Sequence, residues 1–399
     1  MSLLDGARDG RLAAPAEILQ PLEARVTAAG GVDQVERLRE RLEAGTPVAL
    51  FGAGNIGRQS LLALRSLGVE AVCFADETPG KIGQSIEGVA VCTPREAARR
   101  VAPSGLFLCT FYGPRASLDA ACTRISRELG QVAASFLPLI RLAPSAFQEH
   151  YAFETSCEAV EASFAQVDWL FRRLTDESSR ALLAAQQAFR LTLDSSVLPP
   201  PEPPLSALAE NGVAFEPVTF VDCGAYDGDT VNAFIEVSGG RFRRIVAYEP
   251  DVGNFALLQG GVGRLPPAWR ERIECRNAGV WCEDTVASFS RTGTPGSAVC
   301  QDGSASVELV ALDRHVPTDG PVILKLDVEG AEAEALRGAA ALLSRHQAIA
   351  CVSVYHRPQD LWRLPMLIDE LAPGRRLQLR AHGYDGADLM VYAFPSIAE

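Results

Sequence analysis

The chain of 399 residues is longer than one ordinary hydrophobic core requires, which predicts two α/β domains with connecting segments. Hydrophobic residues make up 47% and charged residues 22% of the chain, a composition that excludes a disordered protein. The formal net charge of -13 would repel a phosphate backbone or an anionic membrane, so nucleic acid is a poor candidate partner.

The apolar segments and the cysteines predict a cytoplasmic protein without a membrane span. No apolar run approaches the ~18 residues that a membrane helix needs, and residues 1–12 mix acidic, basic and glycine residues where a signal peptide is apolar. The ten cysteines are scattered and contain no CxxC pair. We therefore expect reduced, mostly buried thiols.

Residues 1–45 are predicted to be a helical segment and residues 46–140 a Rossmann-like module. Asp33 followed by Glu36 resembles a capping box, and apolar residues then recur at helical spacing up to Gly45. In the module, apolar strands alternate with helices, which predicts a parallel sheet. The predicted strands cover residues 47–52, 71–76, 106–110 and 132–137, and the predicted helices cover residues 55–67 and 116–129.

A glycine-rich turn follows the first strand of this module. Gly52, Gly54 and Gly57 form a GxGxxG pattern between a strand and a helix, and Asp76 ends the next strand. Because the turn contains no acidic residue, its amides could accept a phosphate, while Asp76 could bind ribose hydroxyls. The pattern predicts a nucleotide or nucleotide-sugar site. An NAD-dependent oxidoreductase and a scaffold that has lost its ligand are the alternatives.

Residues 141–215 are predicted to be a helical bridge that ends in a proline-rich linker. Apolar residues recur at helical spacing over residues 160–174, and residues 178–191 continue in helical style. Five prolines between residues 199 and 204 can neither continue a helix nor pair in a central strand. A second domain is therefore expected over residues 216–399.

The second domain opens with another strand, glycine turn and helix. Its turn contains two glycines and three carboxylates: Asp222, Gly224, Asp227, Gly228 and Asp229. The carboxylates would oppose the pyrophosphate of a dinucleotide, whereas S-adenosylmethionine (SAM) has no phosphate and carries cationic sulfonium and amino groups. The sequence therefore favours SAM over NAD here, and Asp229 or Thr230 is expected to cap the following helix.

Two further strands are expected to bring nucleoside-binding residues to the same edge of the sheet. Residues 245–250 contain Glu249 at the strand end, where a carboxylate can accept both ribose hydroxyls. Residues 273–281 are predicted to be a third strand, and Ala278 and Gly279 to lie in a loop beside the adenine.

Later strands carry the candidate catalytic residues. A strand ending at Asp327 leads directly into a helix, and a strand ending at His356 follows. Ligands of open α/β sheets bind at such carboxyl ends, and histidine is suited to proton exchange near neutral pH. Glu332 is interpreted as a helix-start residue, because acidic residues favour the first turn.

These segments resemble the FkbM-type methyltransferase family over about residues 218–394. The matching segments are Val221–Ala225, Tyr248–Pro250, Leu324–Glu332, Val354–His356 and Asp360–Trp362. The KLDVEGAE sequence within Leu324–Glu332 is the most specific of them. The resemblance implies a class I, SAM-dependent fold that usually methylates a hydroxyl of a polyketide, sugar or glycolipid.

Carried over residue by residue, the resemblance places Asp222 and Gly224 in the SAM turn, Glu249 at the ribose, and Asp327 with Glu329 in the signature. The pair Tyr226–Asp227 departs from the family, in which many members have a less acidic and less bulky pair. The N-terminal module is similar to Rossmann-like modules attached to sugar acetyltransferases and sugar methyltransferases.

We therefore expect two Rossmann-like, doubly wound α/β domains joined by a helical bridge, the second a methyltransferase acting on a small-molecule or glycan acceptor. Asp327 and His356 are the expected catalytic residues, and a metal-free site is favoured over a shared divalent ion. Assembly into a homo-oligomer stays open. The expected cofactor-binding residues are Asp222, Gly224, Ala225, Tyr226, Gly228, Asp229, Glu249, Ala278 and Gly279 for SAM, and Gly52, Gly54, Gly57 and Asp76 for a nucleotide.

Overall fold

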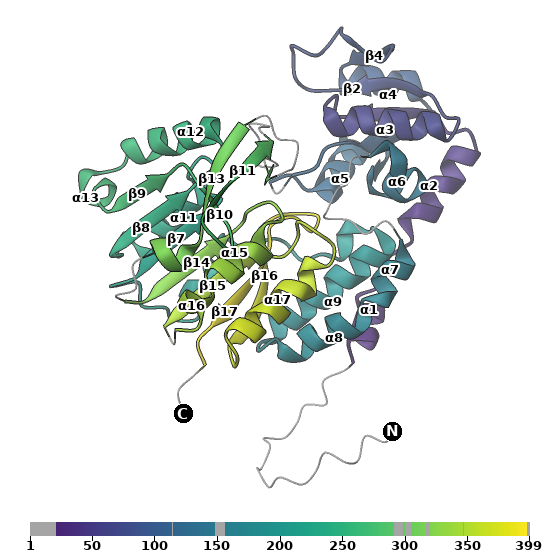
Figure 1. Ribbon diagram of the computed structural model, residues 1–399. Coiled ribbons are helices and arrows are strands. Elements are labelled where there is room, and N and C mark those ends of the chain that lie inside the picture. Colours follow the sequence, from purple (N-terminus) through teal and green to yellow (C-terminus); the bar gives the residue numbers. More distant parts are fainter. Residues whose placement is uncertain are drawn as a thin grey trace, which may run out of the picture.

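The computed structural model describes residues 21–396 except residues 114, 148–155, 291–297, 300–304, 317–319 and 346. It contains two parallel-sheet units and a layer of helices beside the larger one (Figure 1). The predicted mixed α/β fold with two doubly wound sheets is thus confirmed. Among the described residues, no helix is both long and apolar enough to cross a membrane.

The N-terminal unit is a six-stranded sheet in the order β3-β4-β2-β1-β5-β6. All pairs are parallel except β3 with β4. β1 is buried on both faces, as expected for an apolar strand covered by helices on each side. The strands are β1 (Val48–Phe51), β2 (Ala71–Ala75), β3 (Ser85–Ile86), β4 (Val89–Cys92), β5 (Leu106–Cys109) and β6 (Val132–Ser135). The helices are α2 (Gln34–Glu43), α3 (Asn55–Ser66), α4 (Pro94–Val101), α5 (Leu118–Leu129) and α6 (Leu137–Leu142).

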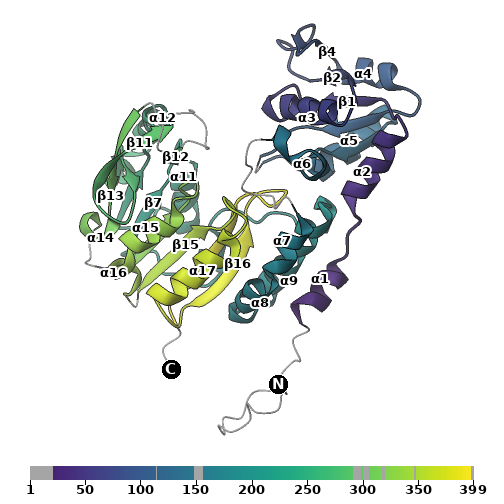
Figure 2. The ribbon, with the colours of Figure 1, turned by 45° about the vertical axis from the view of Figure 1, so that its right-hand side comes forward.

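The helical bridge shares a hydrophobic core with the C-terminal sheet. α9 packs on β16 (Arg376–Ala381), α8 packs on α17 (Asp360–Leu371), and α1 from the N-terminal segment packs on α9 (Figure 2). The sequence placed α1 in a separate segment, but Leu22 and Val26 on α1 belong to this core. The helices are α1 (Leu22–Ala29), α7 (Cys157–Ala162), α8 (Phe164–Arg173), α9 (Glu177–Thr192) and α10 (Ser206–Glu210).

The proline-rich linker is fastened to the C-terminal sheet. The Glu202 amide donates to the Ala381 carbonyl at 2.8 Å, and the Glu202 carboxylate pairs with Arg380 at 3.2 Å. The buried Arg380 also pairs with Asp176 at 3.3 Å and Glu210 at 3.2 Å. One guanidinium therefore joins α9, the linker and α10 to β16.

The C-terminal unit is a seven-stranded sheet in the order β16-β17-β15-β14-β7-β8-β9, in which β17 is antiparallel to both neighbours. Its strands are β7 (Thr219–Cys223), β8 (Arg244–Tyr248), β9 (Ile273–Arg276), β14 (Val322–Leu326), β15 (Ala348–Ser353), β16 (Arg376–Ala381) and β17 (Leu389–Phe394). Its helices are α11 (Asp229–Ser238), α12 (Val252–Gly263), α13 (Pro267–Arg270), α14 (Leu312–His315), α15 (Glu332–Gly338), α16 (Ala340–Leu343) and α17 (Asp360–Leu371).

Two local predictions for this unit are wrong. Residues 273–281 are not one strand: the chain leaves the sheet after β9, and the Asn277 side chain donates to the Glu249 carbonyl at 2.8 Å. The chain then enters a small sheet of β10 (Gly279–Val280), β11 (Thr285–Ser290), β12 (Ala298–Val299) and β13 (Ala305–Val310). The N-cap of α11 is Gly228, with φ of 92°, and neither Asp229 nor Thr230 supplies a side-chain cap.

Candidate active site

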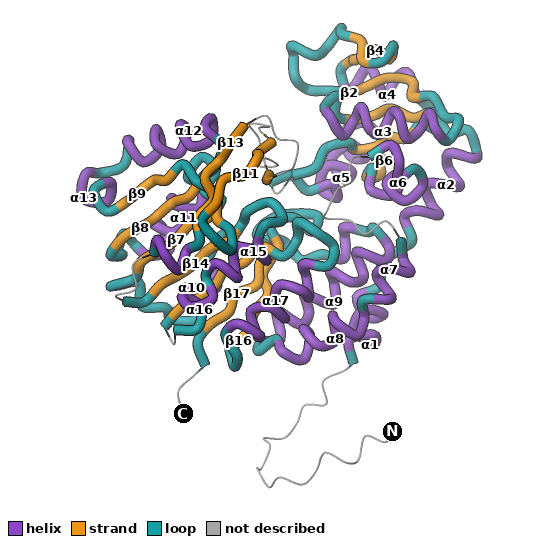
Figure 3. Tube along the Cα trace, viewed as in Figure 1, coloured by secondary structure: helices purple, strands orange, loops and turns teal. Residues whose placement is uncertain are grey.

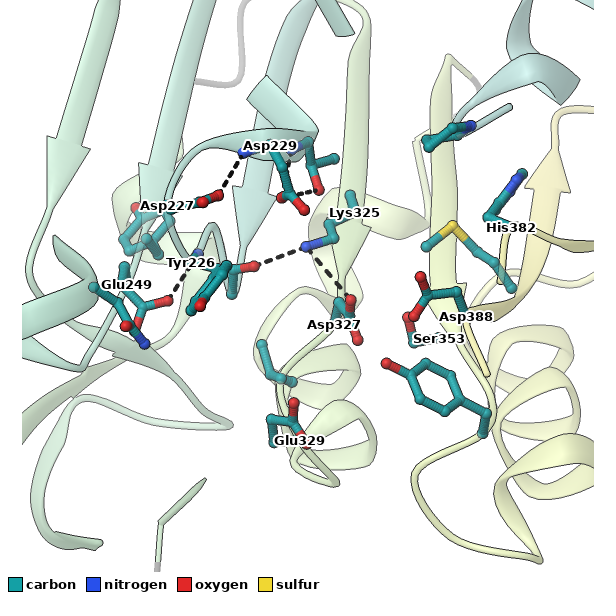
Figure 4. A pocket seen from close by; sticks show the side chains of 18 of the residues that line it. Tyr226, Asp227, Asp229, Glu249, Lys325, Asp327, Glu329, Ser353, His382 and Asp388 are labelled. Carbon is teal, nitrogen blue, oxygen red and sulfur yellow. Dashed lines mark hydrogen bonds and ion pairs between the residues drawn. The ribbon is translucent and has the colours of Figure 1, made fainter. Parts of the chain in front are cut away.

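A cavity of about 840 Å³ lies at the carboxyl ends of the central strands of the seven-stranded sheet. Gly224 follows β7, Glu249 follows β8, Asp327 follows β14 and Tyr355 follows β15, and all four line the cavity. Figure 4 shows Glu249 and Asp327 in it. Loops of both units gather on this side of the sheet (Figure 3). The N-terminal module contributes Ile56, Tyr112, Gly113 and Arg115 to the lining.

Hydrogen bonds hold the N-terminal module against the loop between β16 and β17. The buried Asp385 carboxylate accepts from the Leu118 amide at 2.9 Å, and the Tyr112 hydroxyl donates to the Asp385 carbonyl at 3.4 Å. Arg115 and Asp229 form an exposed ion pair at 3.5 Å. These contacts fix the position of the N-terminal module relative to the C-terminal unit, and therefore the position of its residues in the cavity lining.

The turn after β7 is fixed between two neighbouring strands. A Cβ atom at Gly224, where φ is 78°, would lie 1.8 Å from the Asp327 carbonyl oxygen, so only glycine fits. The amides of Gly224 and Ala225 both donate to the Tyr248 carbonyl at 3.0 Å. The turn therefore presents its outer side, including Tyr226 and Asp229, to the cavity.

Asp222 lies behind this turn and supports it. Its carboxylate is 0% exposed and pairs with the Lys325 ammonium at 3.1 Å. That ammonium also donates to the Gly224 carbonyl at 2.8 Å. Burial alone would lower the pKa of Lys325, but Asp222 and Asp327 raise it. The sequence argument counted Asp222 among the charges facing the ligand; its charge is instead balanced by Lys325, and Asp227 and Asp229 supply the acidic lining.

Glu249 is placed to receive a nucleoside. It is buried, lines the cavity, and accepts from the Tyr226 amide and the Asp251 amide, both at 2.9 Å. Burial raises its pKa, although these amides act in the opposite direction. A carboxylate has about four acceptor positions, and the Asn254 side chain also bonds to Glu249, so one position remains for a hydroxyl donor.

Most of the predicted SAM residues reach the cavity, and the rest support it. Those lining it are Gly224, Tyr226, Asp229, Glu249, Ala278 and Gly279. Asp222, Ala225 and Gly228 do not line it. Ala225 is instead part of a hydrophobic core cluster.

His356 lies between carboxylates that contact its two ring nitrogens. Its ring is 1% exposed, with Nδ1 2.7 Å from Glu332 and Nε2 3.2 Å from Asp327 and 3.6 Å from Glu329. Burial alone would lower the pKa of His356, but Glu332, Asp327 and Glu329 raise it to about 10. The ring is therefore an imidazolium at neutral pH, and it holds Asp327 at the cavity wall.

Glu332 does more than begin a helix. Its carboxylate is 0% exposed, receives the Val328 amide at 2.9 Å and contacts His356. The sequence interpretation missed this role because acidic residues at a first helical turn are common. Lys325 was also missed, although a lone lysine within an apolar strand pointed to a buried partner.

The same cluster offers ligand atoms to a cation. Atoms of Asp327, Glu332 and His356 lie within 4.8 Å of one another. However, Glu332 contacts Nδ1 and Asp327 contacts Nε2, on different sides of the ring. One ion bound to a single ring nitrogen could not replace both contacts, so the geometry favours an ion-paired network over a chelate.

The glycine turn of the N-terminal module carries its own carboxylate. Asp76 accepts from the Ala53 amide at 2.8 Å and the Thr78 amide at 2.8 Å, and pairs with Lys81 at 3.0 Å. Burial would raise the pKa of Asp76, but these donors lower it to about 2. The Asp76 carboxylate thus already accepts the hydrogen bond of the Ala53 amide, which a phosphate bound at this turn would need. Gly52, Gly54, Gly57 and Asp76 also do not line the 840 Å³ cavity.

We expect Asp76→Ala to destabilise the N-terminal module without changing the affinity of the chain for SAM. Two amides and Lys81 would lose their acceptor, at a cost of about 1–3 kcal/mol. Thermal unfolding of the full chain measures this, with Glu77→Ala as the control, since Glu77 is exposed and pairs only at the surface with Arg124. Unchanged stability together with the loss of a bound nucleotide would favour the ligand-binding interpretation of Asp76.

Comparison with known proteins agrees with the motifs. Residues 222–385 match the family described as "Methyltransferase FkbM domain". No curated protein matches the chain. The crystal structure of methyltransferase FkbM from Methylobacillus flagellatus KT superposes with a TM-score of 0.70 and 22% identity, covering 94% of this chain and 98% of that one.

Two further structures are only remotely similar. Precorrin-6y C5,15-methyltransferase from Geobacter metallireducens GS-15 has a TM-score of 0.30 at 11% identity, covering 48% of this chain and 87% of that one. A putative rRNA methylase from Clostridium thermocellum has a TM-score of 0.33 at 12% identity, covering 50% and 100%. Residues 222–385, which supply most of the lining of the 840 Å³ cavity, are thus similar to a methyltransferase FkbM domain.

Proposed function

We propose that the chain transfers a methyl group from SAM to a hydroxyl of a sugar, glycolipid or polyketide-like small molecule. The observation that carries this proposal is the 840 Å³ cavity, in which Glu249 and the acidic turn after β7 lie on one side and Asp327 on another. The family match supports methyl transfer, and the lining supports the choice of donor and acceptor.

The residues present fit SAM. Glu249 retains acceptor capacity for a ribose hydroxyl, while Ala278 and Gly279 provide a small apolar surface for a base. Asp227 and Asp229 add negative charge, which favours cationic sulfonium and amino groups over a pyrophosphate. When bound, SAM would supply an electrophilic methyl group on a cationic sulfur.

The acceptor is a neutral or cationic hydroxyl compound in this proposal. Carboxylates of Asp227, Asp229, Asp327, Glu329 and Asp388 line the cavity, and such a lining would repel an anionic acceptor. Positioning carries most of the catalysis of a simple displacement, up to roughly 7–11 kcal/mol. Within it, Asp327 faces the reacting groups and His356 acts by holding Asp327 in place.

The other predictions for the N-terminal module have less support. The Asp76 contacts favour the scaffold alternative over a nucleotide site, and nothing in the fold or the comparisons supports the NAD-dependent oxidoreductase. The N-terminal module instead forms one wall of the acceptor site, because four of its residues line the cavity.

Incubation of the full chain with methyl-labelled SAM and a panel of methyl glycosides and hydroxylated macrolactones tests the proposal. We expect an O-methylated product, with the same rate after dialysis against a chelator. Label on nitrogen or carbon would contradict the hydroxyl acceptor. Activity lost to the chelator and restored by a divalent ion would contradict the metal-free network at His356.

A further inference from the structure

The loop between β16 and β17 places a second carboxylate, Asp388, on the cavity. Asp388 lines the cavity on the side across from Lys325 and Asp327 (Figure 4). It lies beyond residues 222–385, the segment matched to the methyltransferase family, and no sequence pattern pointed to it.

Asp388 occupies an unfavourable backbone conformation. Its φ is 48°, in the left-handed region that favours glycine, and its carbonyl accepts from the His382 amide at 2.9 Å. Left-handed residues that are not glycine persist where the surrounding structure fixes them, and they cluster at functional sites.

A neighbouring hydroxyl also points to a ligand. The Ser353 side chain is 1% exposed and lines the cavity, and its Oγ has no hydrogen-bond partner among the described residues. Ser353 is paired with Met390 in the β15–β17 register, two residues from Asp388. Since buried polar groups are nearly always hydrogen-bonded, Ser353 is suited to contact a bound polar molecule beside Asp388.

The other acidic groups of the site are poorly suited to take a proton. The Asp327 carboxylate is already engaged by two cations, the His356 imidazolium at 3.2 Å and the Lys325 ammonium at 3.9 Å. His356 already carries a proton on each ring nitrogen. Among the described residues, Asp388 forms no ion pair: burial and then Asp327 raise its pKa to about 6, with Asp229 acting in the same direction and Tyr355 and His356 in the other.

We propose that Asp388 is the catalytic base, which binds the acceptor hydroxyl together with Ser353 and takes its proton. This assignment rests on the proposed methyl transfer. As the acceptor oxygen bonds to the methyl carbon, the carbon–sulfur bond breaks and its electron pair goes to sulfur. The hydroxyl proton passes to the Asp388 carboxylate, which becomes neutral and later returns the proton to water. The ionised form of Asp388 is required, so kcat should rise with pH through about 6.

The test compares Asp388→Asn with Asp385→Asn in the full chain. Both residues lie in the same loop at positive φ, where asparagine is tolerated, so both variants should fold. Asp385 does not line the cavity, and asparagine at position 385 keeps an acceptor oxygen for the Leu118 amide. Carbon-13 NMR of labelled aspartate, assigned by difference between wild type and variants, measures the titration of Asp388 without SAM or an acceptor.

We expect Asp388 to titrate near pH 6, and Asp388→Asn to lower kcat toward methyl glycosides by roughly 10²–10⁴-fold with unchanged SAM affinity. Asp385→Asn, which changes a carboxylate of the same loop that does not line the cavity, should lower kcat far less than Asp388→Asn does. Titration of Asp388 near its ordinary value of 3.8, or full activity of Asp388→Asn, would overturn the assignment. Failure of wild type to bind SAM in calorimetry would instead overturn the proposed function, which the titration does not depend on.

Discussion

Replacement of His356 by alanine is expected to lower the free energy of unfolding by about 3–5 kcal/mol, because it leaves the Glu332 carboxylate fully buried without its cationic partner. Chemical denaturation of the purified chain measures this loss. His315→Ala is the matched control, since His315 pairs with Asp284 at the surface and such pairs contribute about 1 kcal/mol or less.

A double replacement tests the interaction between His356 and Glu332 directly. His356→Leu combined with Glu332→Met removes both charges and should recover much of the stability that either single change loses. Additive losses in the double variant would show that the two side chains do not interact in the folded protein.

The pH dependence of stability follows from the raised pKa of His356. Its pKa is about 10 in the folded chain and 6.5 ordinarily, so the folded state binds this proton more tightly. The stabilisation is complete below pH 6.5 and is lost as pH rises through 10. Wild type should therefore lose stability over this range, and His356→Ala should show a smaller loss. Equal pH dependence of the two proteins would contradict the imidazolium assignment.

Replacement of Glu249 by alanine is expected to weaken SAM binding by tenfold or more, because hydrogen bonds to a charged group contribute roughly 1.5–3 kcal/mol. Alanine also leaves the Tyr226 and Asp251 amides without their acceptor, so the turn after β7 should become less ordered. Glu249→Gln separates the two effects, since it keeps an acceptor oxygen for these amides but loses the charge. Unchanged SAM affinity in a folded Glu249→Ala variant would show that the ribose lies elsewhere.

Strand-and-turn patterns predicted much of the site. Glycines after a strand, and acids at strand ends, are local features, and the parallel sheet brings the ends together, which is why Gly224, Glu249 and Asp327 line one cavity. The sequence was a poorer guide to how the carboxylate beside each glycine turn is used, Asp76 in the N-terminal module and Glu249 in the C-terminal unit. Asp76 and Glu249 each accept a turn amide, but only Asp76 is also paired with a lysine five residues later.

Contacts between distant segments could not be predicted. Glu332 resembles any helix-start acid until His356, from the loop after β15 and not from the strand end that the sequence predicted, is placed against it. Asp388 has no distinguishing pattern, because its position depends on a hairpin loop with left-handed residues. The contribution of Tyr112 and Arg115 depends on how the N-terminal module stands on the C-terminal unit, which strand and helix periodicity does not determine.

SAM binding in the cavity beside Glu249 is the central expectation for this protein. Isothermal titration of SAM into the full chain at neutral pH tests this, with Glu249→Ala and Asp76→Ala measured alongside wild type. We predict one SAM per chain in wild type, unchanged affinity in Asp76→Ala and a loss of tenfold or more in Glu249→Ala. No binding by wild type at millimolar SAM, or binding lost in Asp76→Ala and kept in Glu249→Ala, would contradict the account.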